Sequence, residues 1–233
     1  MDSEVSMDLF RETVSQIAKS VPGFEIRYKD ESWSSKVIAV LVWIFNREYM
    51  TRFTTTRYPR VYFPSREYVE ASPMTATKIL MHEFVHLWDR KQMGWWFSIG
   101  YMLPQALALV FIVGAITCAI WQPWWVAVIS AACGVLCLLP LPAYWRMKFE
   151  MRGYTMNMLV NFYRYGFVRE STVEWITKQF TGSAYYFMWP CGAESRVRKA
   201  CKLVADDELR GWLASYNTND FPYLVAKETL RGS

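Results

Sequence analysis

The most distinctive pattern in the chain is a long uncharged stretch between two segments of mixed hydrophobic and charged residues. The 54 residues from Gln92 to Trp145 contain no Lys, Arg, Asp or Glu. A bilayer core about 30 Å thick needs roughly 20 apolar residues per helix, so this block can hold two spans and a turn. We expect transmembrane helices at about 100–120 and 125–145, joined near Pro123.

Aromatic and basic residues mark the ends of the two expected spans. Trp and Tyr gather at the entry, the turn and the exit, as in interfacial belts: Trp95, Trp96, Tyr101, Trp121, Trp124, Trp125, Tyr144 and Trp145. Lys and Arg flank only the outer ends, so the positive-inside rule places both termini in the cytoplasm. A buried hairpin of a soluble protein, or a re-entrant loop, is less favoured because core helices rarely run 20 residues without a polar face.

The two flanking segments predict a mainly helical fold with a few strands. A Ser-Pro pair at 72–73 and a capping box at 171–174 mark two helix starts. Apolar residues at helical spacing indicate the helices, and alternation rich in Thr, Tyr and Val indicates the strands. We expect helices at 4–19, 73–92, 146–165, 171–180, 193–204 and 222–230, and strands at 24–29, 49–56 and 60–63. The apolar run at 33–45 could be a buried helix or a strand, and Ser34 and Ser35 as caps favour the helix.

These elements predict an α+β fold, in which a mainly helical domain with a small β-hairpin or sheet carries an inserted two-helix transmembrane hairpin. Residues 1–92 and 146–233 would form the two parts of the domain, and residues 93–145 the hairpin.

An aromatic content of 17% excludes a disordered chain. The net charge of +5 without a basic run suits an anionic membrane surface better than nucleic acid. Five cysteines without a CxxC pair indicate reduced thiols.

The chemistry is concentrated in the helix expected at 73–92, which contains His82-Glu83-Phe84-Val85-His86. Histidines four residues apart lie on one helical face and can bind one zinc ion, with Glu83 beside the water that the metal polarises. The chain has only these two histidines, so the spacing is not an accident of a histidine-rich sequence. The alternative is a pair of core histidines beside a surface glutamate.

A zinc site on this motif needs a third protein ligand, and without a third histidine it must be a carboxylate or, less favourably, Cys or Tyr. Glu150 is the leading candidate. Its helix begins where the second span ends, and the motif helix ends where the first span begins, so both helices lie at the same membrane face. Asp89 better suits a hydrogen bond to a ligand histidine. The remaining competitors are Glu170, Glu174 and Glu194.

An HExxH helix, a hydrophobic hairpin and a glutamate early in the next helix resemble the gluzincin metallopeptidases. In architecture they resemble the integral-membrane CAAX-protease and heat-shock membrane protease group. The resemblance covers residues 73–165. It implies a zincin-like catalytic domain with Zn²⁺ held by His82, His86 and Glu150, and with Glu83 as the catalytic base.

The chain departs from this group at one position. The third-ligand glutamate usually continues as ExxxD, but Tyr154 stands where the aspartate is expected. Asp89 is therefore expected to support a ligand histidine, and Tyr154 is a candidate donor to the substrate oxyanion. Other candidate donors are Arg152, Tyr185 and Tyr186. In zincins the preceding hairpin commonly offers an edge strand to the substrate, so residues 54–63 are either this shelf or a plain structural hairpin.

These features predict a membrane-anchored zinc metalloendopeptidase that hydrolyses peptide or protein substrates near the cytoplasmic membrane surface. Its partners would be the lipid bilayer and such a substrate, with no nucleic acid. The alternative is a non-catalytic membrane scaffold or interaction protein with structural zinc. That alternative is disfavoured because structural zinc sites usually take four, often cysteine, ligands, and Glu83 would have no role in one.

Overall fold

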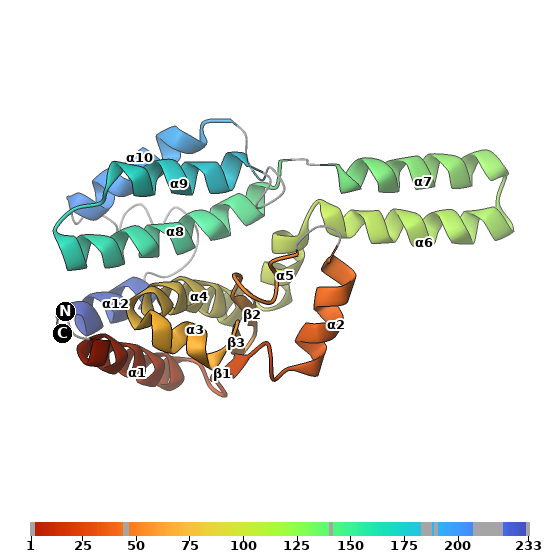
Figure 1. Cartoon of the computed structure of the whole chain (residues 1–233). Helices are drawn as coiled ribbons and strands as arrows, with labels where there is room; N and C mark the ends of the chain where they lie inside the picture. The colour runs from red at the N-terminus through yellow and green to blue at the C-terminus, as the bar shows by residue number, and fades with distance from the viewer. Residues whose placement is uncertain are drawn as a thin grey trace.

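The structure is a computed structural model that describes residues 3–43, 47–139, 142–182, 188, 191–206 and 221–231 (Figure 1). The described residues form a mainly helical molecule with one three-stranded sheet, which confirms the α+β class. The helices are α1 (Ser3–Ser20), α2 (Trp33–Val42), α3 (Arg66–Ala71), α4 (Pro73–Met93), α5 (Trp95–Met102), α6 (Gln105–Trp121), α7 (Trp124–Leu138), α8 (Tyr144–Tyr165), α9 (Glu170–Thr181), α10 (Ala193–Ala205) and α12 (Phe221–Arg231). The strands are β1 (Glu25–Tyr28), β2 (Thr55–Arg57) and β3 (Arg60–Phe63).

The sheet has the order β1-β3-β2, so β2 lies at an edge. β1 pairs with β3 in parallel, and β2 pairs with β3 as the expected antiparallel hairpin. The first strand of this hairpin is shorter than the expected range 49–56, because turns occupy the residues from Tyr49 to Arg52. Lys29 explains this difference: its buried ammonium group donates to the carbonyls of Tyr49 and Phe53, both at 2.7 Å, and holds this segment as turns.

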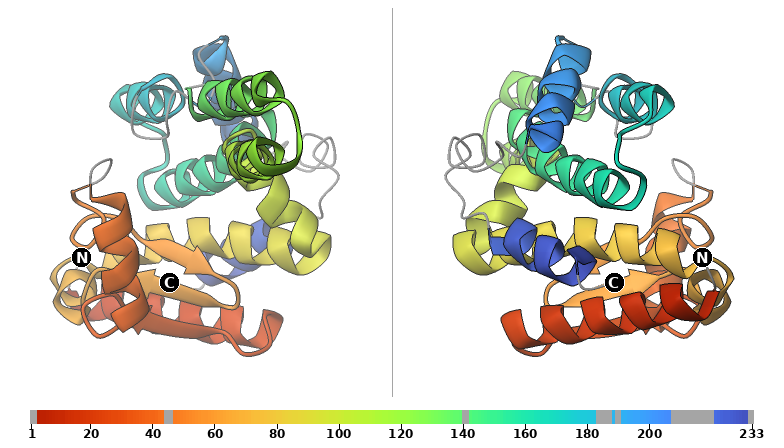
Figure 2. Two further views of the ribbon diagram at one scale, coloured as in Figure 1. Left: turned by 90° about the vertical axis from the view of Figure 1, so that its right-hand side faces the viewer. Right: turned by 90° about the vertical axis from the view of Figure 1, so that its left-hand side faces the viewer.

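Helix α4 lies between α1 with the sheet on one side and α8, α9 and α10 on the other (Figure 2). A hydrophobic core packs against it on each side. Leu80, Phe84 and Leu87 pack into one core with α1 and β3. Met81 and Val85 pack into the other core with α8, α9 and α10. Because apolar residues surround it, α4 is buried along the HExxH motif, as the sequence predicted. Helix α12 packs beside α1, α4 and α8 (Figure 1).

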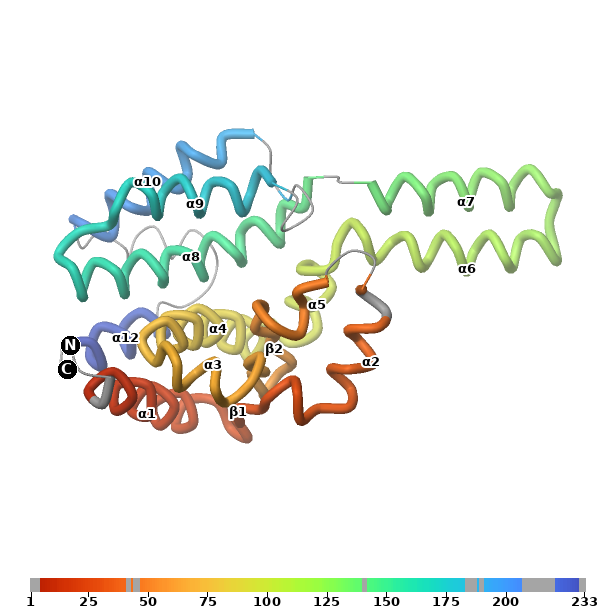
Figure 3. Tube along the Cα trace, viewed as in Figure 1, coloured from red at the N-terminus to blue at the C-terminus, as the bar shows by residue number. Residues whose placement is uncertain are grey.

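Helices α6 and α7 form an antiparallel pair that projects from the rest of the molecule (Figure 3). The expected continuous helix at 100–120 is wrong, since the chain breaks at Leu103 and Pro104 and α5 meets α6 at 83°. A proline inside a helix removes a backbone donor, which accounts for the break. Likewise α7 ends at Leu138, short of the expected end at 145. No single described helix is long and apolar enough to cross a membrane, and α5 with α6 satisfies that criterion only as a bent pair.

The start of α9 also differs from the prediction. Helix α9 begins at Glu170, with Arg169 at the N-cap and no side-chain cap, so the expected capping box at 171–174 is wrong. Glu170 provides a better start, because its carboxylate lies in the first turn and pairs with Arg198 of α10 at 2.5 Å. The helices expected at 193–204 and 222–230 are confirmed as α10 and α12.

Candidate metal centre

The two histidines lie on the face of α4 that packs against α8. Their positions, four residues apart, place both imidazoles one above the other on this face. His82 and His86 are buried, and their Nε2 atoms are 3.1 Å apart. The structure therefore points the two ring nitrogens at the same small volume.

Helix α8 brings Glu150 to the two histidines. The Glu150 carboxylate is 1% exposed; its Oε2 lies 3.4 Å from His82 Nε2, and its Oε1 lies 3.6 Å from His86 Nε2. Among the residues that the structure describes, only this trio of His, Cys, Asp or Glu side chains could hold a metal ion. The expected grouping of the three side chains is thus present in the fold.

The spacing of the three side chains fits a zinc ion. Zinc bonds to nitrogen and oxygen are about 2.0–2.2 Å long, so tetrahedral ligand atoms lie about 3.3–3.6 Å from one another. The two histidine Nε2 atoms are 3.1 Å apart, and each lies close to one carboxylate oxygen of Glu150, His82 at 3.4 Å from Oε2 and His86 at 3.6 Å from Oε1, so the separations are near this range. Glu150 Oε2 is also buried without a hydrogen-bond partner, and such an oxygen is costly unless a cation or donor satisfies it. The side chains present therefore suit zinc.

Tyr101 supports the carboxylate from α5. Its hydroxyl donates to Glu150 Oε1, while its backbone carbonyl accepts a 2.7 Å hydrogen bond from Arg146 Nε. The sequence pattern places Tyr101 in a membrane-interface belt and gives no sign of this contact. The bend between α5 and α6 turns the tyrosine back toward α8, and no local pattern signals that contact.

Electrostatics hold the Glu150 carboxylate in its ionised form. Burial raises its pKa, but the charge of His86, the close contact and charge of His82 and the hydrogen bond from Tyr101 outweigh burial and bring the pKa to about 2. Burial lowers the pKa of His86. Burial also acts to lower the pKa of His82, yet the close contact and charge of Glu150 outweigh it and raise that pKa. An ionised carboxylate is the form that binds a metal.

Gly153 makes the close approach of α8 to His82 possible. A Cβ at this position would lie 2.5 Å from both Cε1 and Nε2 of His82, well inside ordinary contact distance. Only glycine leaves room for the imidazole there. Sequence analysis did not single out Gly153, because the need for it arises where two helices distant in sequence meet.

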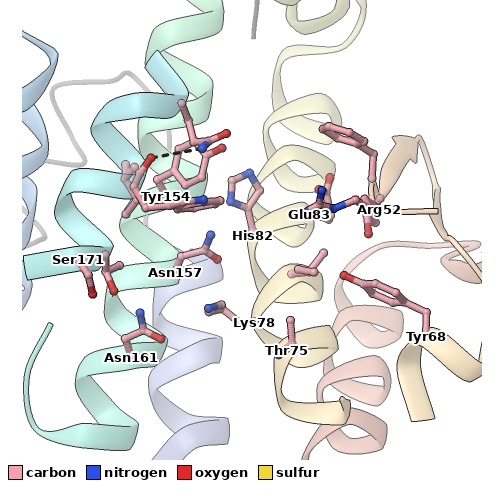
Figure 4. Close-up of a pocket in the computed structure, with 17 residues that line it drawn as sticks. Arg52, Tyr68, Thr75, Lys78, His82, Glu83, Tyr154, Asn157, Asn161 and Ser171 are labelled. Carbon is pink, nitrogen blue, oxygen red and sulfur yellow. Dashed lines mark hydrogen bonds between the residues drawn. The ribbon is translucent and has the colours of Figure 1, made fainter. Parts of the chain in front are cut away.

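Glu83 lies beside the three side chains and faces the edge strand. Its Oε2 accepts a 2.6 Å hydrogen bond from Thr56 Oγ1 on β2. A cavity of about 400 Å³ borders Glu83, both histidines and Glu150, with Tyr101 and β2 also in its wall. A larger cavity of about 650 Å³ lies on the other side of His82 and also borders Glu83 (Figure 4). The glutamate therefore borders both cavities.

Asp89 differs from its expected role. Its Oδ1 lies 3.0 Å from Arg152 Nη2 in a fully buried ion pair, whereas His86 Nδ1 is buried without a hydrogen-bond partner. Burial raises the pKa of Asp89 to about 6, against the opposing charge of Arg152. In this structure Asp89 therefore joins α4 to α8 through Arg152 and makes no hydrogen bond to His86 Nδ1.

The other candidates are distributed as follows. Tyr154 is buried, borders the larger cavity and packs edge-on against the His82 ring at a centroid distance of 5.0 Å. Arg152 is fully buried and borders neither cavity, so it cannot meet a substrate there. The competing carboxylates lie away from the histidines: Glu170 and Glu194 pair with Arg198, and Glu174 is exposed. Tyr185 and Tyr186 lie outside the described residues.

Comparisons with known proteins gave no relative for this chain: no family model, no curated protein and no solved structure matches it.

Proposed function

We propose that the chain is a membrane-anchored zinc metalloendopeptidase that acts on peptide or protein substrates at the cytoplasmic membrane surface. One observation carries the proposal: His82, His86 and Glu150 converge at separations that suit a metal ion, and Glu83 lies beside them on a cavity. Two histidines and a carboxylate form the ligand set of several catalytic zinc sites, which keep a fourth position open. A zincin-like catalytic domain is part of this proposal.

The reaction we propose is hydrolysis of a peptide bond. Zinc held by the three side chains would supply Lewis acidity, which lowers the barrier to attack on a carbonyl and makes a neighbouring water acidic near neutral pH. Glu83 accepts the proton from the attacking water and returns it to the leaving amine. The Thr56 hydroxyl donates to one oxygen of Glu83 and so restrains this carboxylate at the border of the cavity.

Tyr154 is our proposed donor to the oxyanion that forms as the carbonyl is attacked. Its ring packs against His82 and borders the larger cavity, so its side chain lies next to the ligand that faces the substrate. Donors that stabilise charge developing in the transition state contribute strongly to hydrolysis of this kind.

Strand β2 is our proposed shelf for an extended substrate. It is an edge strand, so one side of its backbone is free to pair with an added strand. Its residues Thr55 and Thr56 and the preceding Thr54 border the smaller cavity, and Thr54 also borders the larger one. A peptide on β2 would therefore pass in front of Glu83 and His82.

Exposed apolar side chains gather in one region of the molecule, and they support the proposed position in the membrane. They cover the projecting α6–α7 pair and continue onto α5 and α2, which lie across the axis of that pair (Figure 1). On α5 and α2 they are Trp33, Val37, Val40, Trp95, Trp96, Ile99 and Met102. Cations stack on aromatic rings of this region, with Arg47 over Trp43 at 5.0 Å, Arg90 over Trp95 at 4.5 Å and Lys148 over Tyr144 at 4.9 Å. This combination suits a bilayer interface with anionic lipid.

We therefore propose that α6 and α7 insert into the bilayer, that α5 and α2 rest on its surface, and that both termini are cytoplasmic. In a chain whose five cysteines are replaced by serine, Gln122→Cys should react with a membrane-impermeant maleimide added to intact cells. As a matched control, Ser195→Cys on the exposed surface of α10 should react only after lysis. Reaction of both cysteines only after lysis would overturn the two-span arrangement.

Removal of the metal provides the test of the proposed activity. Purified full-length chain in detergent should contain about one zinc per molecule, measured by atomic absorption, and should cleave a synthetic peptide mixture. Treatment with 1,10-phenanthroline should abolish cleavage, and added zinc should restore it, because the three side chains alone supply no Lewis acid. Cleavage that survives complete loss of the metal would contradict the proposal.

A further inference from the structure

The larger cavity has a chemical character that the proposed hydrolysis does not use. It lies between α4, α8 and α9, on the N-terminal side of His82, and it has a volume of about 650 Å³ (Figure 4). Apart from Glu83 its border contains no carboxylate, whereas Arg52 and Lys78 contribute two cations. Arg52 is paired with Glu48 at 2.9 Å, which leaves Lys78 as the cation without a neutralising partner.

Lys78 is placed to meet a substrate. It precedes His82 by four residues, so it lies on the same face of α4, about 6 Å along the helix axis. Figure 4 shows its ammonium group in the space between α4 and α8, on the side toward Asn157 and Asn161. Within the described part of the chain Lys78 has no hydrogen bond or ion pair, and burial lowers its pKa, with the charge of Arg164 acting in the same direction.

Two amide side chains face this cation from α8. Asn157 is 9% exposed and borders the cavity, and its amide nitrogen is a hydrogen-bond donor. Asn161 follows one turn later and also borders the cavity. A partly desolvated ammonium group between amide groups attracts an anion and offers several donors to it. Lys78 is thus an unsatisfied positive charge one helical turn from the proposed site of hydrolysis.

We propose that this cavity is a substrate subsite that binds a carboxylate, with Lys78 as its counter-charge and with Asn157 and Asn161 as orienting donors. The inference rests on the proposed peptidase function. The carboxylate belongs to an acidic side chain near the cleaved bond or to the C-terminus of the substrate. An added residue of an extended peptide spans about 3.3 Å, so either group lies within one or two residues of the bond.

The test uses purified full-length chain and pairs of synthetic peptides that differ in one group. One pair has Asp or Asn beside the cleaved bond, and the other has a free or an amidated C-terminus. We expect kcat/KM at least 10-fold higher for the carboxylate member of one pair, which identifies the source of the carboxylate. Lys78→Met should bring that ratio close to 1, and Lys78→Arg should preserve most of it. Lys199→Met, on the exposed surface of α10, is the matched control and should keep the wild-type ratio.

A binding measurement separates this inference from the peptidase proposal. In a Glu83→Gln background, a fluorescent carboxylate peptide should bind about 10-fold more tightly than its amide analogue, and adding Lys78→Met should remove the difference. Such binding without any cleavage by the wild type would contradict the peptidase proposal but support the subsite. A ratio that Lys78→Met leaves unchanged, or equal binding of acid and amide peptides to the Lys78 chain, would overturn the subsite.

Discussion

Glu83→Gln is expected to remove peptide hydrolysis almost completely while the chain keeps its zinc. The glutamine side chain has nearly the same shape and can still accept the hydrogen bond from Thr56, but it cannot accept a proton from water. General acid–base groups contribute about 10²–10⁴-fold to rates, and here one residue would serve both proton transfers, so we expect a loss near the upper end. The measurement is kcat/KM for one cleaved peptide, with zinc content determined on the same sample.

Two controls make this result specific to the proposed base. Glu174→Gln makes the same change at an exposed position of α9 and should leave both the rate and the zinc content at wild-type values. Thr56→Val keeps the carboxylate but removes its hydrogen-bond donor, and a smaller loss of kcat is expected. Hydrolysis by Glu83→Gln at the wild-type rate would contradict the role of Glu83 as the base, and absence of hydrolysis by the wild type itself would favour the zinc-binding scaffold.

The part of the centre that lies on one helix could be predicted from the sequence. The 3.6-residue period alone places His82 and His86 on the same face, and the apolar neighbours of the motif indicate burial. Glu150 could be proposed because it is a carboxylate close to the end of the uncharged block. The structure brings it within 3.4 Å of His82, although whether it binds zinc stays a prediction.

The contacts between helices could not be predicted in the same way. The Asp89–Arg152 ion pair, the hydrogen bond from Tyr101 to Glu150 and the close approach at Gly153 each depend on how α4, α5 and α8 cross. No local period encodes these crossings. The start of the uncharged block was misleading. Tyr101 stands near two tryptophans, as in an interfacial belt, and this pattern is the same whether or not its hydroxyl contacts Glu150.

Gly153→Ala is expected to weaken zinc binding strongly without unfolding the chain. The new methyl group would lie 2.5 Å from His82 Nε2, the atom proposed to bind the metal. Ordinary contact begins near 3.4 Å, so either the imidazole or α8 must move by about 1 Å, whereas ligand distances in metal sites tolerate about 0.2 Å. A movement of α8 would displace Glu150 as well. We expect an affinity loss on the order of 100-fold or more, comparable to the largest effects of removing contacts that orient a ligand.

The substitution is expected to lower zinc affinity while it slightly raises the intrinsic stability of α8, so a loss of zinc would not be explained by a loss of helix. Alanine is favoured over glycine inside a helix by about 1 kcal/mol, so the substitution does not itself disfavour α8. Zinc affinity is measured by competition with a chromogenic chelator, and folding by circular dichroism of the metal-free chain. Gly114→Ala adds the same methyl group where α6 meets α7, 3.1 Å from Ser130 Oγ, and should bind zinc like the wild type. If Gly153→Ala also binds zinc like the wild type, then His82 does not bind zinc from the position that it has between α4 and α8.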